Sequence, residues 1–172
     1  MVLTGRSLPD SNFASFVKDD VTVILSVADE PYKLDNNFNF ATQCCLIYAE
    51  SVDISASLIA PGKHLGIFCH DISIQDKVVI DVSGKSGDAG ANSATDNGEP
   101  GGNGANAGDV WVFVQNGVEN TLKKLTIKAF GGDGGEGGDA SAEGKQGGKG
   151  GDGGNGGQSA LPPVVRLVAS NH

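Results

Sequence analysis

The chain has 172 residues, of which 27 are glycine, and a formal net charge of −9 at pH 7. This length suits one domain with a modest hydrophobic core. Nucleic acid and anionic membrane surfaces repel so acidic a chain, and no apolar run is long enough to cross a bilayer. We therefore expect neither a nucleic-acid partner nor a membrane span.

The N-terminal segment and the cysteines bear on the cellular compartment. Residues 1–20 are expected to cap the domain, with a short amphipathic helix or turn at residues 11–20. They lack the basic and apolar regions of a secretory signal. Cys44, Cys45 and Cys69 form an odd set, which favours reduced and buried thiols. Cytoplasmic synthesis fits these features, but localisation stays open because a released protein or a particle component needs no signal of its own.

Strand patterns begin at residue 21 and then repeat. VTVILSV (21–27) is rich in β-branched residues and predicts a strand, whereas residues 29–37, with Pro31, predict a loop. LIYAESVDI (46–54) matches GIFCHDISI (66–74) at an offset of 20 residues. WVFVQN (111–116) continues the series and VRLVAS (165–170) closes it. One column of this alignment is bulky and apolar, and it holds Tyr48, Phe68, Phe113 and Leu167.

A second set of strands follows the first. VVIDVSGK (78–85) matches LTIKAFGG (125–132) at an offset of 47 residues, and SLIAPGK (57–63) aligns with the former at 22. Alternating apolar residues in 78–82 indicate a half-buried strand. Stacked turns would place Asp81 beside Lys128 on the outer face.

Two glycine-rich stretches, residues 84–109 and 131–163, interrupt successive turns and hold 23 of the 27 glycines. The second stretch reads GGDGGEGGD and GGKGGDGGNGG, a period of three that predicts paired extended helices of the polyproline-II type. Each arm would be about 28 Å long at roughly 3.1 Å per residue. A flexible linker needs no such period, and collagen needs proline in its repeat.

These patterns together predict an all-β protein. Residues 21–172 would form one parallel β-helix of about four turns with an open C-terminal turn and two polyglycine-II-type hairpin excursions. Residues 46–49 and 111–114 are apolar on both faces, so both faces of that wall should be covered. We expect the interior to cover one face and the hairpins, folded back, to cover the other; a partner is the alternative.

Few residue patterns predict a catalytic or metal site. Gly84-Lys85 lacks the glycine of a phosphate-binding loop, because Val79 holds that place. GGKGGD (147–152) matches half of a calcium-binding nonapeptide, but no large apolar residue follows. The acidic arm residues remain weak cation candidates, with a solvated edge as the alternative: Asp133, Glu136, Asp139 and Asp152.

The wall strands also carry polar columns. Glu50 aligns with His70 and Gln115, and Ser51 with Asp71 and Asn116. Stacked carboxylates could serve a polysaccharide-acting enzyme, but these columns hold too few acids for that chemistry. His64 and His70 lie near Cys69, yet neighbouring strand residues point to opposite faces, which disfavours a metal site. We expect no enzyme activity and no cofactor.

The paired GGX arms resemble the glycine-helix bundles of snow flea antifreeze proteins and of some phage tail-tip adhesins. The stacked turns with glycine-rich insertions are similar to N-terminal β-helix regions of large fungal and bacterial proteins, some of them toxin-like. The antifreeze resemblance implies small residues at the third position of each triplet. Here the second stretch has acids and Lys149 there. Ala89, Asn92, Asn103 and Asn106 of the first stretch fit that pattern better.

The main functional expectation is a non-catalytic structural module that stacks end to end or docks to further β-structure. Its assembly edge would be Val165, Arg166, Leu167 and Val168. The alternatives are recognition of a glycan, receptor or ice surface by the hairpins, the N-terminal region of a toxin-like protein, and a polysaccharide-acting enzyme. The recognition surface would comprise Asp133, Glu136, Asp139, Lys149, Asp152, Asn155, Asn92, Asn103 and Asn106.

Overall fold

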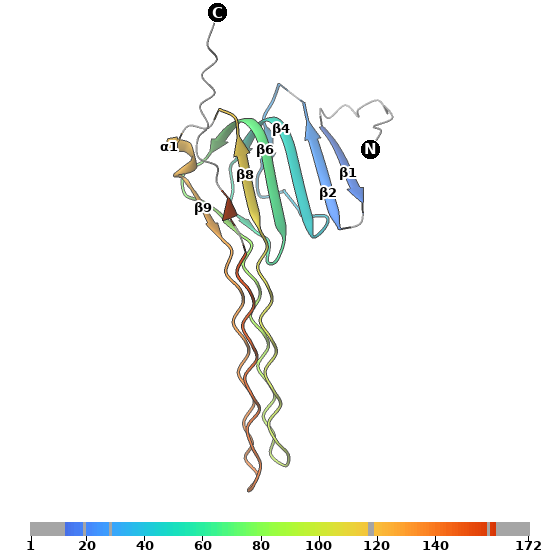
Figure 1. Cartoon of the computed structure of the whole chain (residues 1–172), viewed down its shortest axis with the longest axis vertical. Coiled ribbons are helices and arrows are strands. Elements are labelled where there is room, and N and C mark those ends of the chain that lie inside the picture. Colours follow the sequence, from blue (N-terminus) through green and yellow to red (C-terminus); the bar gives the residue numbers. More distant parts are fainter. Residues whose placement is uncertain (1–12, 19, 28, 117–118, 158, 161–172) are drawn as a thin grey trace, which may run out of the picture.

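The structure, a computed structural model, describes residues 13–18, 20–27, 29–116, 119–157 and 159–160. They form a body of two β-sheets from which four extended arms project (Figure 1). The elements are β1 (Phe13–Lys18), β2 (Val21–Ser26), β3 (Tyr32–Leu34), β4 (Cys44–Ile54), β5 (Leu58–Ile59), β6 (His64–Ile74), β7 (Val78–Asp81), β8 (Val110–Val114), α1 (Glu119–Leu122), β9 (Leu125–Lys128) and β10 (Ser159–Ala160). The predicted all-β class is therefore confirmed.

The larger sheet has seven strands in the order β1-β2-β4-β6-β8-β10, with β3 also beside β4, and the smaller sheet has the order β5-β7-β9. All pairs are parallel except β1 and β2. The helix or turn expected at residues 11–20 is wrong for 13–18, which form a strand. Pairing with the otherwise open edge of β2 satisfies backbone N–H and C=O groups. These hydrogen bonds determine the strand conformation of a segment whose mixed composition does not by itself favour a strand.

The strand registers confirm the sequence alignment in the described turns. Tyr48 lies beside Phe68 and Phe68 beside Phe113, while Leu58 lies beside Ile80 in the small sheet. Asp81 lies beside Lys128, as expected. At β10, however, the register places Ala160 beside Trp111, a place that the alignment gave to residue 165. Residues 165–170, including the expected assembly edge, lie outside the described residues.

The long strands β4 and β6 change which side chains face inward as they pass a corner. In β4, Cys45 and Ile47 are buried before residue 50, whereas Val52 and Ile54 are buried after it. Side chains of a regular strand alternate strictly between its two faces. The alternation must therefore shift by one residue at the corner, here called a slip, if apolar side chains are to face the core both before and after it. The same slip in β6 leaves two successive residues, His70 and Asp71, on the outside.

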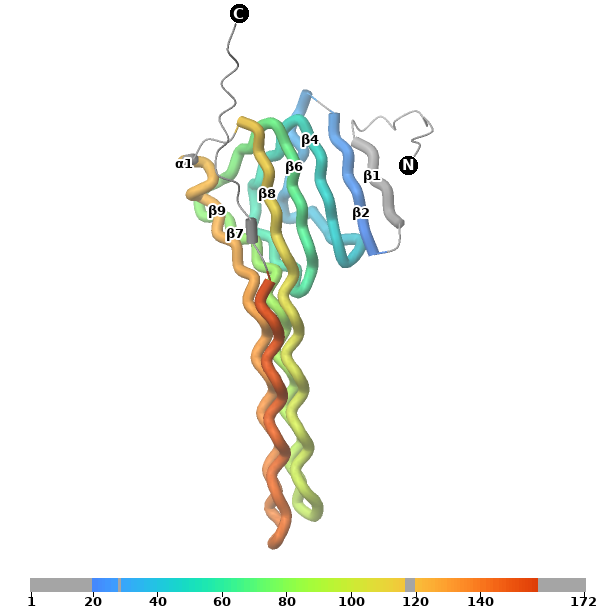
Figure 2. Tube along the Cα trace, in the orientation of Figure 1, coloured from blue at the N-terminus to red at the C-terminus, as the bar shows by residue number. Residues whose placement is uncertain are grey.

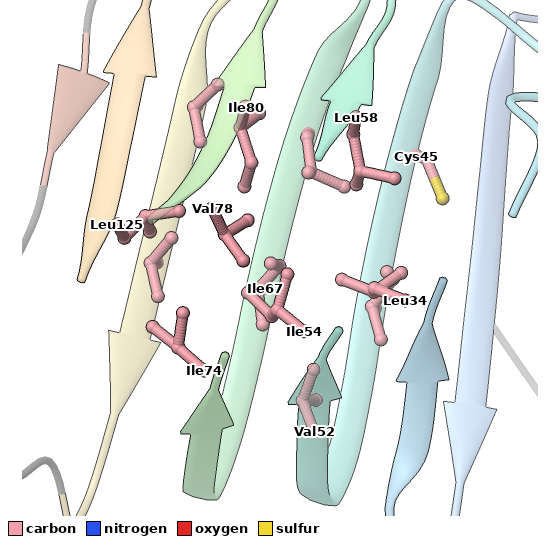
Figure 3. Close-up of a cluster of buried hydrophobic side chains, with 14 of the residues drawn as sticks. Leu34, Cys45, Val52, Ile54, Leu58, Ile67, Ile74, Val78, Ile80 and Leu125 are labelled. Carbon is pink, nitrogen blue, oxygen red and sulfur yellow. The ribbon is translucent and has the colours of Figure 1, made fainter. Parts of the chain in front are cut away.

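The core lies between these walls and the small sheet (Figure 3). Leu34, Ile54 and Val52 come from one wall, Ile67 and Cys45 from another, and Ile80 and Val78 from the small sheet. Most of these side chains are β-branched, which suits close stacking in successive strands. Burying them supplies the main favourable free energy of the body.

Residues 84–92, 98–108, 131–139 and 147–157, here called arms 1 to 4, run side by side away from the body (Figures 1 and 2). The expectation that the hairpins fold back over the wall is wrong. The backbone groups of the arms instead form hydrogen bonds with one another. Arm 1 donates to arm 3 from Gly87 and Gly90, each over 2.8 Å, and Gly84 donates over the same distance to Phe130, just before arm 3. Arms 1 and 4 both bond to the two central arms, 2 and 3.

Glycine is sterically required where arms meet. A Cβ on Gly134 would lie 2.0 Å from the carbonyl oxygen of Gly151 in arm 4. A Cβ on the next residue, Gly135, would lie 2.0 Å from the carbonyl oxygen of Asp88 in arm 1. Arm 3 is thus enclosed on two sides, which explains its pairs of glycines, and only every third residue can carry a side chain.

Candidate functional site

The outer face of the large sheet carries a ladder of aromatic rings, formed by Tyr48, Phe68 and Phe113. Their strands are in parallel register, so identical positions stack on one another. Tyr48 and Phe68 have ring centroids 4.7 Å apart with planes within 9°, and Phe68 and Phe113 are 5.1 Å apart within 8°. Tyr48 is 40% exposed and Phe113 44%, so the ladder faces solvent.

Gly66 makes room for this ladder. A Cβ there would lie 2.8 Å from a methyl group of Leu46 and 3.0 Å from the ring of Phe68. The glycine therefore lets the Phe68 ring lean over its own strand. In the alignment of the strands, the residues equivalent to Gly66 are Leu46 and Trp111, which both have large side chains.

A polar row runs parallel to the aromatic ladder at the corner of the wall. Nδ1 of His70 lies 2.8 Å from a carboxylate oxygen of Asp71 and 3.9 Å from one of Glu50. When Nδ1 donates to Asp71, Nε2 can accept from the Asn116 side-chain amide 3.4 Å away. The hydrogen bond to Asp71 raises the pKa of His70, with the nearby carboxylates adding to this effect. The aligned columns Glu50–His70–Gln115 and Ser51–Asp71–Asn116 thus form one polar rim.

The ladder and the Glu50–His70–Gln115 column of the rim together line a shallow groove of about 1160 Å³. It crosses β2, β4, β6 and β8, and Val27 and Asp29 are also part of its lining. Its lining contains the carboxylates of Asp29 and Glu50 but neither lysine nor arginine. The groove therefore combines an apolar floor with a polar border that carries two carboxylates and His70.

The thiols offer no reactive group to this groove. Cys69 borders it, but its side chain is directed into the core, and burial together with the charge of Asp71 raises its pKa to about 12. Burial, with a smaller effect of Cys44, raises the pKa of Cys45 to about 11. Of the three cysteines, Cys45 and Cys69 are buried, as expected, and Cys44 is half-buried. Thiolate chemistry at neutral pH is therefore disfavoured.

The residues predicted as a recognition surface on the second glycine-rich stretch are divided between two arms of the bundle. Asp133, Glu136 and Asp139 are exposed along arm 3, at the place in each triplet that faces neither arm 1 nor arm 4. Lys149, Asp152 and Asn155 are exposed along arm 4. Both rows are therefore open to solvent.

The predicted asparagines have partners within the bundle. Asn103 and Asn106 accept hydrogen bonds from the backbone N–H groups of Asp152 and Asn155, both over 2.9 Å. Asn92 accepts from the N–H of Asp139 over 2.7 Å. These side-chain amides link adjacent arms. The link is a structural reason for asparagine at these positions that does not involve a ligand.

A metal centre finds no support in the described residues, where no three His, Cys, Asp or Glu side chains come close enough to hold an ion. His64 lies on the body far along the strand from His70; its Nδ1 is 3.2 Å from Asp109 and its ring stacks on Trp111 at 6.4 Å. These contacts close the base of the first hairpin. His64 thus has a local structural role.

The aromatic groove was absent from the predicted sites although its signal was in the sequence. The aligned column Tyr48, Phe68 and Phe113 was assigned to a covered wall, because both faces of those strands are apolar. Only the direction of the hairpins, away from the wall, shows that the column faces solvent.

Within the described part of the chain, no helix has the length and apolar character needed to cross a bilayer. Comparison of the chain with family models, curated proteins and solved structures found no match.

Proposed function

We propose that the protein is a non-catalytic structural module that assembles end to end with further β-structure, in the first instance with a second copy of itself. In this proposal the body is a short parallel β-helix of about four turns. The four arms form a polyglycine-II-type bundle that acts as a rigid rod beside the assembly axis. The corner slips in β4 and β6 and the three-residue period of the arms support these two assignments.

The observation that carries the proposal is the state of the core at its β9 end. Ile80 in β7 is fully buried, whereas Ile127, its neighbour in β9, is only half-buried. Ile127 belongs to the apolar side chains packed against the core. In the described residues no further strand lies over β9. An added turn from another molecule would complete the burial of Ile127.

The backbone at this end supports the same proposal. An edge strand presents N–H and C=O groups that pair readily with another strand. The β9 edge is four residues long, and β10 covers only two residues of the neighbouring β8. Stacking a further turn would extend both sheets in the parallel register that relates the turns already present.

The test is light scattering after size-exclusion chromatography across a concentration series, on the wild type, Ile127→Lys and Thr126→Lys. A charge directed into the open end should block stacking, so Ile127→Lys should elute as a monomer where the wild type forms larger species. Thr126 is exposed on the outer face of the same strand, and its lysine variant should assemble like the wild type. Wild-type protein that stays monomeric at the highest concentration would refute the proposal.

A further inference from the structure

We propose that the groove on the outer face of the large sheet docks a basic amphipathic peptide segment of a partner protein. This inference is independent of end-to-end assembly, because the groove is lined by residues of β2, β4, β6 and β8 and by none of β9. Three exposed large apolar side chains border the groove, with Val27 75%, Phe113 44% and Tyr48 40% exposed. Exposed apolar patches with polar rims are typical of interaction sites.

Charge indicates which peptide would bind. The groove lining includes Asp29, Glu50 and His70, and the His70 ring is hydrogen-bonded to Asp71 of the rim. No lysine or arginine lines the groove, and the chain as a whole has a net charge of −9. Lysine or arginine side chains on the partner would meet these carboxylates while its apolar face covers the rings. A second copy of the same face would bring carboxylates together and is disfavoured.

The direction of the rings distinguishes a peptide from a sugar chain. The three rings are nearly parallel and stacked, so each ring within the ladder covers the face of its neighbour. The faces on which a sugar ring would stack are therefore largely occupied, and the solvent meets mostly ring edges. Branched aliphatic side chains pack against such edges without needing a free face.

The size of the groove fits a short helix. Four strands spaced by about 4.8 Å give a floor about 14 Å long, which equals roughly ten helical residues at 1.5 Å each. An apolar stripe at helical spacing would lie along the ladder, and basic residues beside it would reach Glu50 and Asp29.

The experiment measures fluorescence anisotropy of a labelled helical peptide of about 12 residues that has a leucine face and a lysine face. We expect binding to the full chain that weakens as salt increases. A matched peptide with glutamate in place of lysine should not bind. Asp29→Lys/Glu50→Lys should weaken binding of the lysine peptide by about tenfold or more.

The matched control is Asp133→Lys/Asp139→Lys, which makes the same change of net charge on the bundle and should alter affinity by less than about threefold. Tyr48→Ser/Phe113→Ser, checked for native circular dichroism, should also lose binding. Equal loss in the bundle variant, equal binding of the glutamate peptide, or no binding at all would each overturn the proposal. Binding of a neutral hexasaccharide in place of the peptide would also overturn it.

Discussion

Gly150 and Gly151 are adjacent in arm 4 but have different neighbours. A Cβ on Gly151 would lie 1.9 Å from the carbonyl oxygen of Gly102, a backbone atom that cannot move aside. A Cβ on Gly150 would lie 3.6 Å from the nearest atom, the carbonyl oxygen of Gly135, which is ordinary contact. Neither glycine has a positive φ. Only one of the two is therefore required by the packing of the bundle.

This difference predicts opposite effects of alanine at the two positions. Gly151→Ala should lower the free energy of unfolding by about 3 kcal/mol or more through overpacking. Gly150→Ala should raise it by about 0.4–1 kcal/mol, because the unfolded chain loses conformational freedom while the native arm tolerates the methyl group. Urea denaturation followed by circular dichroism measures both. Equal destabilisation by the two substitutions would contradict the arrangement of arms described above.

At the scale of elements, asparagine side chains join neighbouring arms. Asn103→Ala removes the acceptor for the N–H of Asp152. We expect the unfolding free energy to fall by about 0.5–1.5 kcal/mol, and by the lower figure if water replaces the oxygen. Hydrogen exchange of the Asp152 amide should become faster. Asn103→Asp keeps an acceptor oxygen and should restore most of the protection, whereas a purely solvent-facing Asn103 would leave exchange unchanged in both variants.

The sequence predicted the elements whose pattern recurs from turn to turn. The parallel registers of β4, β6 and β8 follow from an alignment of apolar residues in which each turn constrains the next. The elements without a repeated pattern were missed: β1, the short β3 inside the expected loop at 29–37, and α1. The two strands are fixed by tertiary pairing, β1 with the edge of β2 and β3 with β4.

The candidate site was predictable only in part for a related reason. The columns at Tyr48 and Glu50 were identified, but sequence periodicity cannot tell a covered apolar face from an exposed one. That choice depends on whether the hairpins fold over the wall. They do not, because the arms form hydrogen bonds with one another. Every third amide of arm 4 from Gly148 to Gly157, for example, donates to a carbonyl on the arm 3 side.

At the scale of the whole molecule, the length of the bundle is divided into layers by a hydrogen-bond pattern between the arms that has a period of three residues. One transverse layer of the bundle consists of residues 87–89, 101–103, 134–136 and 150–152. Deleting this layer brings Gly90 opposite Asp133, and Gly104 opposite Lys149, in the same bonding pattern that Gly87 and Gly101 have now. The shortened bundle should therefore keep its packing.

We expect the layer deletion to fold and to shorten the molecule by about 9 Å, three residues at roughly 3.1 Å each, in its maximum dimension from small-angle X-ray scattering. Deleting Gly134 alone should instead disrupt the bundle. It would move Glu136 into the place of Gly135, where a Cβ lies 2.0 Å from the carbonyl oxygen of Asp88. Thermal unfolding should remain cooperative in the first variant and broaden in the second. If both variants unfold alike, the arms are not held in a fixed phase, and the bundle cannot act as the rigid rod of the proposed assembly.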